Sequence, residues 1–230
     1  MVDAAPADAD AILHGRRDLL ERYADLLRGP GVERGLLGPR EPDRLWSRHL
    51  LNCAVIEPLI GPGEQVLDLG SGAGLPGLVL ACVRSDIQVT LVEPMARRVA
   101  FLEECVAAIG LTTVTVLRVR AEELAGQVTA TTLTARAVAP LDRLVPMALP
   151  LLEPHGQLLA MKGSGAQAEL VAARAALRRW PVEAADVVTC GEGVVETPTT
   201  VVRVRLGSAP TRRGRPGAAS GARSRKGGVG

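Results

Sequence analysis

From residue 64 onward the sequence alternates between short apolar stretches and longer segments with helical spacing. Strands separated by helices indicate a parallel sheet covered by helices on both faces. The expected strands are 64–70, 88–92, 114–119, 131–136 and 157–162, followed by two adjacent β-rich segments at 182–190 and 199–206. The expected helices are 75–83, 95–109, 141–151 and 165–180. The prediction is therefore an α/β chain with a mostly parallel seven-stranded sheet, in which a terminal hairpin supplies the antiparallel last strand.

Two further helical patterns precede this alternation. The first spans 8–29 and ends at a Gly-Pro-Gly sequence, and the second spans 42–60 with Pro42 in its first turn. The end of the chain is rich in glycine, alanine, serine and arginine. We therefore expect a helical extension over 1–63 packed on the core, a core domain over 64–207, and a disordered basic tail over 208–230.

The formal net charge of +2 conceals an uneven distribution of charge. The tail carries six basic residues and no acidic one, so the rest of the chain has 21 basic against 25 acidic residues, a formal charge of −4. A surface that binds a polyanion on the folded part must then be a local basic patch. Lys162 is the only lysine ahead of the tail.

Several classes of protein do not fit this sequence. It has no run of eighteen apolar residues, which argues against a membrane protein, and no basic segment before an apolar one at its N-terminus, which argues against a secretory signal. Its four cysteines form no Cys-X-X-Cys pair and lie in apolar surroundings. We expect a cytoplasmic protein with reduced, buried cysteines and without a metal site.

A glycine-rich turn joins the first expected strand to the helix that follows it. Gly70, Gly72 and Gly74 recur at every second position after the acidic Asp68, and Leu75 stands where a dinucleotide-binding loop would have its third glycine. Glycines in this position let the backbone approach a ligand closely. The spacing therefore argues for a nucleoside-binding loop and against a nicotinamide dehydrogenase.

The ends of the next two strands carry residues suited to the rest of a nucleoside. Glu93 follows the second strand, where a carboxylate accepts hydrogen bonds from both ribose hydroxyls. Ala121 and Glu122 follow the third strand, where an adenine edge would lie. Together with the glycine loop, these features resemble the class I methyltransferases, and the resemblance implies a Rossmann-like fold with S-adenosyl-L-methionine as cofactor.

A closer resemblance covers roughly residues 10 to 206. It includes Arg-His-Leu-Leu-Asn at 48–52, Asp-Leu-Gly-Ser-Gly-Ala-Gly-Leu-Pro-Gly at 68–77, Arg-Arg-Val-Ala-Phe-Leu at 97–102, Arg-Ala-Glu-Glu at 120–123, Ala-Arg-Ala at 135–137 and Met-Lys-Gly at 161–163. On these motifs the chain resembles the glucose-inhibited division protein B family, also called RsmG. It departs from the family's frequent Thr-Gly-Pro-Gly loop at Ser71 and Ala73, and its segment 35–39 replaces an Asn-Leu-Thr stretch.

The resemblance implies an enzyme that methylates N7 of a guanine in 16S ribosomal RNA (position 527 in the numbering usual for the family's substrate), acting on that RNA or on a small-subunit particle. It implies a monomer. The cofactor contacts that carry over are Gly70, Leu75, Ala121, Glu122 and Arg136, and Gly72, Gly74 and Glu93 join them from the loop and the ribose position.

Missing residues agree with this chemistry. The segment after the fourth strand, Ala-Arg-Ala-Val-Ala-Pro at 135–140, lacks the Asn-Pro-Pro-Tyr type of motif used on exocyclic amines, and no cysteine nucleophile follows the fourth or fifth strand. Guanine N7 needs neither, because its lone pair is free and it has no proton to remove. Methyl transfer to N7 then depends on proximity and orientation.

Basic residues at strand ends are the candidates for holding the substrate. We assign Arg136 and Lys162 to the guanine or its phosphate, and Arg48 and His49 to RNA contacts. Plainer interpretations stay open, because a strand-end arginine can equally form a salt bridge and a lone histidine can belong to the core or the surface. A small-molecule or protein methyltransferase on the same fold, and an RNA-binding module that keeps a ligand pocket, are the alternative functions.

Overall fold

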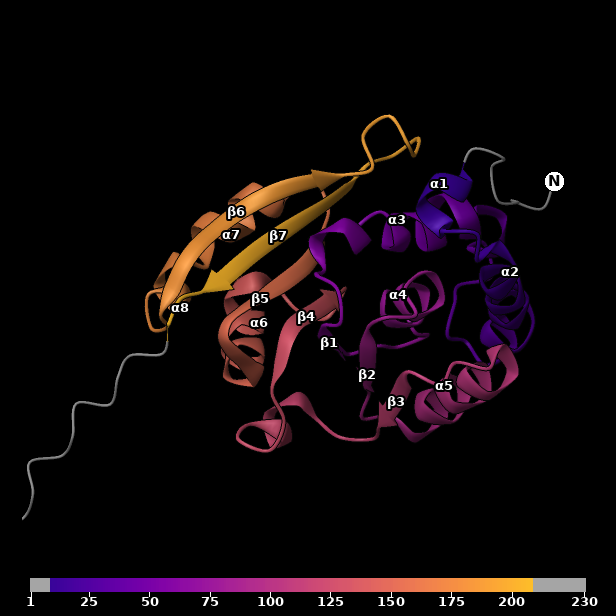
Figure 1. Cartoon of the computed structure of the whole chain (residues 1–230), viewed down its shortest axis with the longest axis horizontal. Coiled ribbons are helices and arrows are strands. Elements are labelled where there is room, and N and C mark those ends of the chain that lie inside the picture. Colours follow the sequence, from indigo (N-terminus) through magenta and orange to yellow (C-terminus); the bar gives the residue numbers. More distant parts are fainter. Residues whose placement is uncertain (1–8, 209–230) are drawn as a thin grey trace, which may run out of the picture.

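A seven-stranded sheet in the strand order β3-β2-β1-β4-β5-β7-β6 forms the centre of the computed structural model, which describes residues 9–208. The first five strands pair in parallel, and β7 pairs antiparallel with both β5 and β6 (Figure 1). The strands are β1 (Gln65–Leu69), β2 (Gln88–Val92), β3 (Val114–Leu117), β4 (Ala130–Arg136), β5 (Leu152–Lys162), β6 (Val182–Cys190) and β7 (Thr199–Leu206). The predicted α/β fold, with its antiparallel last strand, is confirmed.

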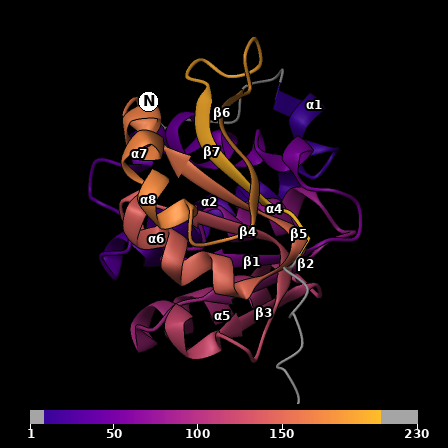
Figure 2. The same cartoon turned by 90° about the vertical axis from the view of Figure 1, so that its left-hand side faces the viewer.

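Helices cover both faces of the sheet. One face carries α4 (Gly77–Val83) and α5 (Ala96–Ile109), and the other carries α6 (Leu141–Ala148), α7 (Ala166–Ala172) and α8 (Arg174–Leu177). Figure 2 shows α6, α7 and α8 stacked on one side of the strands. Each face buries its own apolar cluster, so that the central strands are buried on both sides, as their continuous apolar sequences require.

The N-terminal helices lie over the face formed by α4 and α5 (Figure 1). They are α1 (Asp10–Leu13) and α2 (Arg17–Leu26), and α2 packs against both α4 and α5. Leu20 and Tyr23 of α2 are fully buried in this contact. Burying a leucine side chain is worth about 1.5–3 kcal/mol, so the extension is fixed to the core by its apolar face.

The predicted helix over 42–60 is not continuous. The segment consists of η3 (Pro42–Arg44), η4 (Leu45–Leu50), α3 (Leu51–Ala54) and η5 (Glu57–Leu59), in which η4 is a wider π-helical turn. Pro58 lacks the N–H that an α-helix would use, which accounts for the change to a 3-10 turn at its end. The π-helical turn carries Arg48 and His49, and such turns often occur at functional sites.

Other boundaries differ by a few residues. The first helix ends in a π-helical turn around Pro30, η2 (Leu27–Gly31), and the helix predicted over 165–180 is interrupted at Ala173. The strand β5 begins five residues earlier than predicted and includes His155 at a positive φ of 65°. The remaining short elements are η6 (Ala121–Leu124) and η7 (Leu149–Leu151). Except for Ser208, the predicted disordered tail lies outside the described residues.

Over the part of the chain that the structure describes, none of the helices has both the length and the apolar character needed to cross a bilayer. Cys53, Cys82, Cys105 and Cys190 are all free thiols and all buried, as the sequence predicted.

Candidate active site

The glycine loop leaves the sheet between β1 and α4, at the carboxyl edge of the parallel strands. Its first two amides, those of Gly70 and Ser71, donate to the carbonyl of Val92 at the end of β2. Asp68 is fully buried beneath the loop, where it accepts hydrogen bonds from Thr134 Oγ1 at 2.8 Å and Gly77 N at 3.3 Å. Burial raises the pKa of Asp68 to about 6.

A cavity of about 270 Å³, here called the Glu93 pocket, lies beside this loop. Four of its lining residues are predicted cofactor contacts, Gly70, Glu93, Ala121 and Glu122. They come from the ends of three neighbouring strands, β1, β2 and β3, which meet at the same edge of the sheet. Arg98, Arg120 and Met147 also line the pocket.

Glu93 itself is buried and fully engaged with its surroundings. Its carboxylate accepts hydrogen bonds from Gly72 N at 3.1 Å and Met95 N at 3.0 Å, and Arg98 Nη1 lies 3.4 Å from it. The Glu93 side chain is only 1% exposed, whereas that of Arg98 is 38% exposed. Arg98 is therefore the partner that a ligand hydroxyl could replace most easily.

Gly72, Gly74, Leu75 and Arg136, the other predicted cofactor contacts, do not line the Glu93 pocket. Gly72 supports it indirectly through its hydrogen bond to Glu93. Gly74 has a φ of 103° and faces the N-terminal helix, where an added Cβ would lie 2.7 Å from Tyr23 Oη and 2.5 Å from Leu78 Cδ1. Tyr23 donates a 2.6 Å hydrogen bond to the carbonyl of Ala73, so the extension contacts the loop directly.

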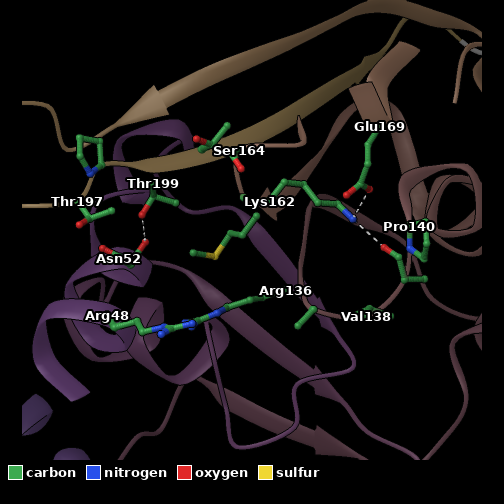
Figure 3. Close-up of a pocket in the computed structure, with 16 residues that line it drawn as sticks. Arg48, Asn52, Arg136, Val138, Pro140, Lys162, Ser164, Glu169, Thr197 and Thr199 are labelled. Carbon is green, nitrogen blue, oxygen red and sulfur yellow. Dashed lines mark hydrogen bonds and ion pairs between the residues drawn. The ribbon is translucent and has the colours of Figure 1, made fainter. Parts of the chain in front are cut away.

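A second and larger cavity, the Arg136 pocket, lies at the ends of β4 and β5 (Figure 3). Its volume is about 850 Å³, within the range of about 300–1,000 Å³ usual for ligand sites. Its lining includes three cations, Arg48, Arg136 and Lys162, together with Asn52 and the hydroxyl residues Ser164, Thr197, Thr199 and Thr200. Arg136 and Lys162 are thus brought together as predicted, and Arg48 lies with them.

The two pockets share a wall. Ala137 and Val138 line both of them, in the short loop between β4 and α6. Ala137 adopts a positive φ of 55°, an uncommon conformation for a residue with a side chain. A ligand in either pocket would therefore contact this same loop.

Lys162 holds the loop that forms this wall. Its Nζ donates to the carbonyl of Ala139 at 2.7 Å and lies 2.8 Å from Glu169 Oε2. The same carboxylate oxygen accepts the Leu141 amide at 2.9 Å, and the pairing with Lys162 lowers the pKa of Glu169. Only 11% of the Lys162 side chain is exposed, so its ammonium group already has partners within the protein.

His49 is placed behind the Arg136 pocket instead of on its surface. The residue is 8% exposed and does not line the cavity. Its Nδ1 lies 2.6 Å from Arg136 Nη2, and its Nε2 lies 2.6 Å from Glu41 Oε2. Asn52, one turn further along, has a side-chain oxygen that is buried and has no hydrogen-bond partner among the described residues.

Sequence reasoning missed four residues that shape these pockets. Glu41, Tyr23, Glu169 and Asn52 each contact or line a site although they lie outside the strand ends. Asn52 belongs to a quoted motif but received no role. Glu41 precedes Pro42 and the basic segment up to His49, and this charge pairing is the only one of the four that the sequence signals.

A family model described as rRNA small subunit methyltransferase G matches residues 16–197. The chain belongs to this family. A relative from Thermobifida fusca, named ribosomal RNA small subunit methyltransferase G, is 54% identical over 205 residues, which cover 89% of this chain and 86% of its own. A relative from Streptomyces coelicolor with the same name is 54% identical over 82% of this chain and 80% of its own. The resemblance predicted from the motifs is thereby confirmed.

Two solved structures with a similar fold are named as methyltransferases. One is a SAM-dependent methyltransferase from Aquifex aeolicus, with a TM-score of 0.53 and 17% identity over 77% of this chain and 98% of that chain. Another is a SAM-dependent O-methyltransferase from Thermotoga maritima, with a TM-score of 0.53 and 15% identity over 69% of this chain and 65% of that chain. At this identity they show the Rossmann-like methyltransferase fold alone.

Proposed function

We propose that this protein transfers the methyl group of S-adenosyl-L-methionine to N7 of a guanine in 16S ribosomal RNA. The observation that carries the proposal is the pair of pockets that meet at Ala137 and Val138. One is built for a nucleoside and the other is lined by cations. The relatives' names, which specify ribosomal RNA of the small subunit, supply the substrate class.

The Glu93 pocket fits the cofactor. Glu93 is a buried carboxylate at the ribose position, and it accepts the two ribose hydroxyls once Arg98 moves aside. Ala121 and Glu122 border the adenine. A Cβ added at Gly70 would lie 2.9 Å from Val138 Cγ2, so glycine keeps the loop clear of Val138 at this position. When bound, the cofactor would supply the sulfonium methyl group that is transferred.

The Arg136 pocket suits a guanine that presents N7. Arg136 and Arg48 are donors for O6 or for a phosphate, and the unpartnered oxygen of Asn52 accepts from the N1–H and N2–H₂ donors of guanine. Lys162 acts on the loop, as a positioning residue that keeps Ala139 in place. Lys162 also lines the pocket, so its predicted contact with the guanine or a phosphate stays a prediction beside this positioning role.

The lack of an available base supports N7 as the target. Among the described residues that line the Arg136 pocket, Glu169 is the only carboxylate, and it is occupied by Lys162 and the Leu141 amide. Methylation of an exocyclic amine or a hydroxyl requires a proton to leave, whereas N7 requires only alignment with the methyl group.

A transfer assay tests this function. Purified protein is incubated with methyl-labelled S-adenosyl-L-methionine and either 16S RNA or small subunits from a strain that lacks the gene. We expect one methyl group per RNA, and none after Arg136→Ala. Label that enters a metabolite or protein fraction, with none in RNA, would favour the alternative of a small-molecule or protein methyltransferase. Binding of RNA without cofactor affinity would favour a non-enzymatic RNA-binding module.

A further inference from the structure

Glu41 directly precedes η3 and the π-helical turn that follows it, and its carboxylate pairs with basic side chains from both. Its Oε2 is 2.6 Å from His49 Nε2 and 3.9 Å from Arg48 Nε, and its Oε1 is 3.0 Å from Arg44 Nη2. The Glu41 side chain is 23% exposed, so this carboxylate is partly withdrawn from water, and it pairs with Arg48, which lines the Arg136 pocket. One carboxylate thus pairs with three basic side chains, those of Arg44, Arg48 and His49.

The imidazole of His49 connects this carboxylate to Arg136. A guanidinium has only donors, so His49 Nδ1 must accept from Arg136 Nη2, and its proton therefore resides on Nε2 and is donated to Glu41. Burial, together with the charge of Arg136, lowers the pKa of His49, and the hydrogen bond from His49 lowers the pKa of Glu41. A neutral imidazole between a carboxylate and a guanidinium thus gives each of these three side chains a hydrogen-bond partner.

Arg136 depends on its hydrogen bond to His49 because its other side-chain contact is weak. Its Nη1 approaches the thiol of Cys53 at 3.1 Å, and sulfur is a poor acceptor. In Figure 3, Arg48 and Arg136 extend toward each other along one side of the pocket, an arrangement that like charges oppose. The negative charge of Glu41 offsets this repulsion for Arg48 directly, and it reaches Arg136 through His49.

We infer that Glu41 and His49 are positioning residues for the methyl transfer, which hold the guanidinium of Arg136, with Arg48 beside it, where the guanine binds. The inference rests on the proposed function of the Arg136 pocket. It gives His49 a role different from the predicted RNA contact, because the imidazole acts through Arg136 and not on the RNA.

Two substitutions of His49 separate its two hydrogen bonds. His49→Asn places an amide oxygen near the position of Nδ1, so it keeps an acceptor for Arg136 and loses Glu41. His49→Gln places its amide near the position of Nε2, so it keeps Glu41 and loses Arg136. Both remove the same buried ring, so a general loss of packing affects them alike. We expect His49→Gln to be the slower of the two.

Glu41 is tested with a control from the same turn. Glu41→Ala should slow single-turnover transfer to 16S RNA by about 10- to 100-fold, the loss expected when a substrate-positioning group shifts by about 1 Å. Glu41→Gln should restore part of the rate, because its amide oxygen still accepts from Nε2. Asp43→Ala removes one negative charge two residues away and should stay within about twofold of the wild type, as ordinary surface substitutions do. Cofactor affinity should be unchanged in all of them.

Titration of His49 by NMR gives a readout that does not require activity. The chain has three histidines, so the signal is assigned from the His49 variants. Arg136→Ala should raise the pKa of His49, because the cation that faces Nδ1 is removed, and Glu41→Ala should lower it further. A His49 pKa indifferent to both substitutions would overturn the inference, as would wild-type transfer by Glu41→Ala. A wild-type protein that methylates no RNA would instead overturn the proposed function, and the titration would still decide whether the chain of contacts exists.

Discussion

Replacing Tyr23 with phenylalanine tests whether the N-terminal extension holds the glycine loop. The hydroxyl is fully buried and donates a 2.6 Å hydrogen bond to the Ala73 carbonyl. Burial raises the pKa of Tyr23 well above its usual value, so the group remains a donor at every pH at which the protein is handled. Removing one partner of a buried hydrogen bond costs about 1–3 kcal/mol of unfolding free energy.

Gly74 provides the second half of this test. In Gly74→Ala the new Cβ meets Leu78 Cδ1 at 2.5 Å and Tyr23 Oη at 2.7 Å, at a φ of 103°. Overpacking costs about 1–3 kcal/mol and the backbone strain a similar amount, so the total is about 2–6 kcal/mol. Gly110→Ala is the matched control, because Gly110 has a φ of 82° but no atom within 4 Å of the added Cβ.

The double variant joins the two effects. Without the Tyr23 hydroxyl, one of the two clashes at position 74 disappears, so Tyr23→Phe with Gly74→Ala should cost less than the sum of the single changes, by about 0.5 kcal/mol or more. Urea unfolding of the four proteins measures this difference. Cofactor affinity should change by less than about tenfold, or 1.4 kcal/mol, because Gly70 and Glu93 keep their places. Strict additivity, or a Tyr23→Phe protein as stable as the wild type, would refute the contact.

Three further predictions concern the two pockets. Glu93→Ala should weaken S-adenosyl-L-methionine binding by about 1.5–3 kcal/mol in calorimetry, the usual worth of hydrogen bonds to a charged group, and unchanged affinity would contradict the ribose assignment. Asn52→Ala should lower kcat/KM for RNA by a factor that corresponds to about 1–3 kcal/mol of activation free energy, with cofactor affinity intact. An unaltered kcat/KM would contradict a role of Asn52 in guanine recognition. The single-turnover rate at saturating RNA and cofactor should be flat from about pH 7 to about pH 9 and should fall only below about pH 6.5, the ordinary histidine pKa. Burial lowers the pKa of His49, and protonation of its Nδ1 would remove the acceptor for the Arg136 hydrogen bond. A rate that rises tenfold per pH unit would instead indicate a general base.

The sequence predicted the fold and the Glu93 pocket because both depend on local patterns. Alternating strands and helices determine the sheet, and the carboxyl ends of its parallel strands meet at one edge. Residues that follow those strands, such as Gly70, Glu93 and Ala121, therefore had to lie together. The bounds of β2, β6 and β7 also agree with the prediction.

The contacts made between distant segments were beyond such reasoning. Glu41 reaches Arg136 only because the π-helical turn brings His49 between them, and Tyr23 reaches Ala73 only because α2 packs over α4. Spacing along the chain does not reveal which acid will pair with Lys162, although its position at the end of β5 was predicted. The sequence likewise identified Gly74 as part of the loop but not the helix that it faces.

Identification of the methylated atom tests the central claim most directly. The 16S RNA of small subunits that lack the modification is methylated with the purified protein, treated with mild alkali to open the ring of any N7-methylguanine, cleaved at the opened sites, and mapped by primer extension. The account predicts strand scission at a single guanine that depends on both cofactor and enzyme and is lost in Arg136→Ala. Methyl label that enters the RNA but resists ring opening and scission would contradict it, because the methyl group would then reside on an atom other than N7.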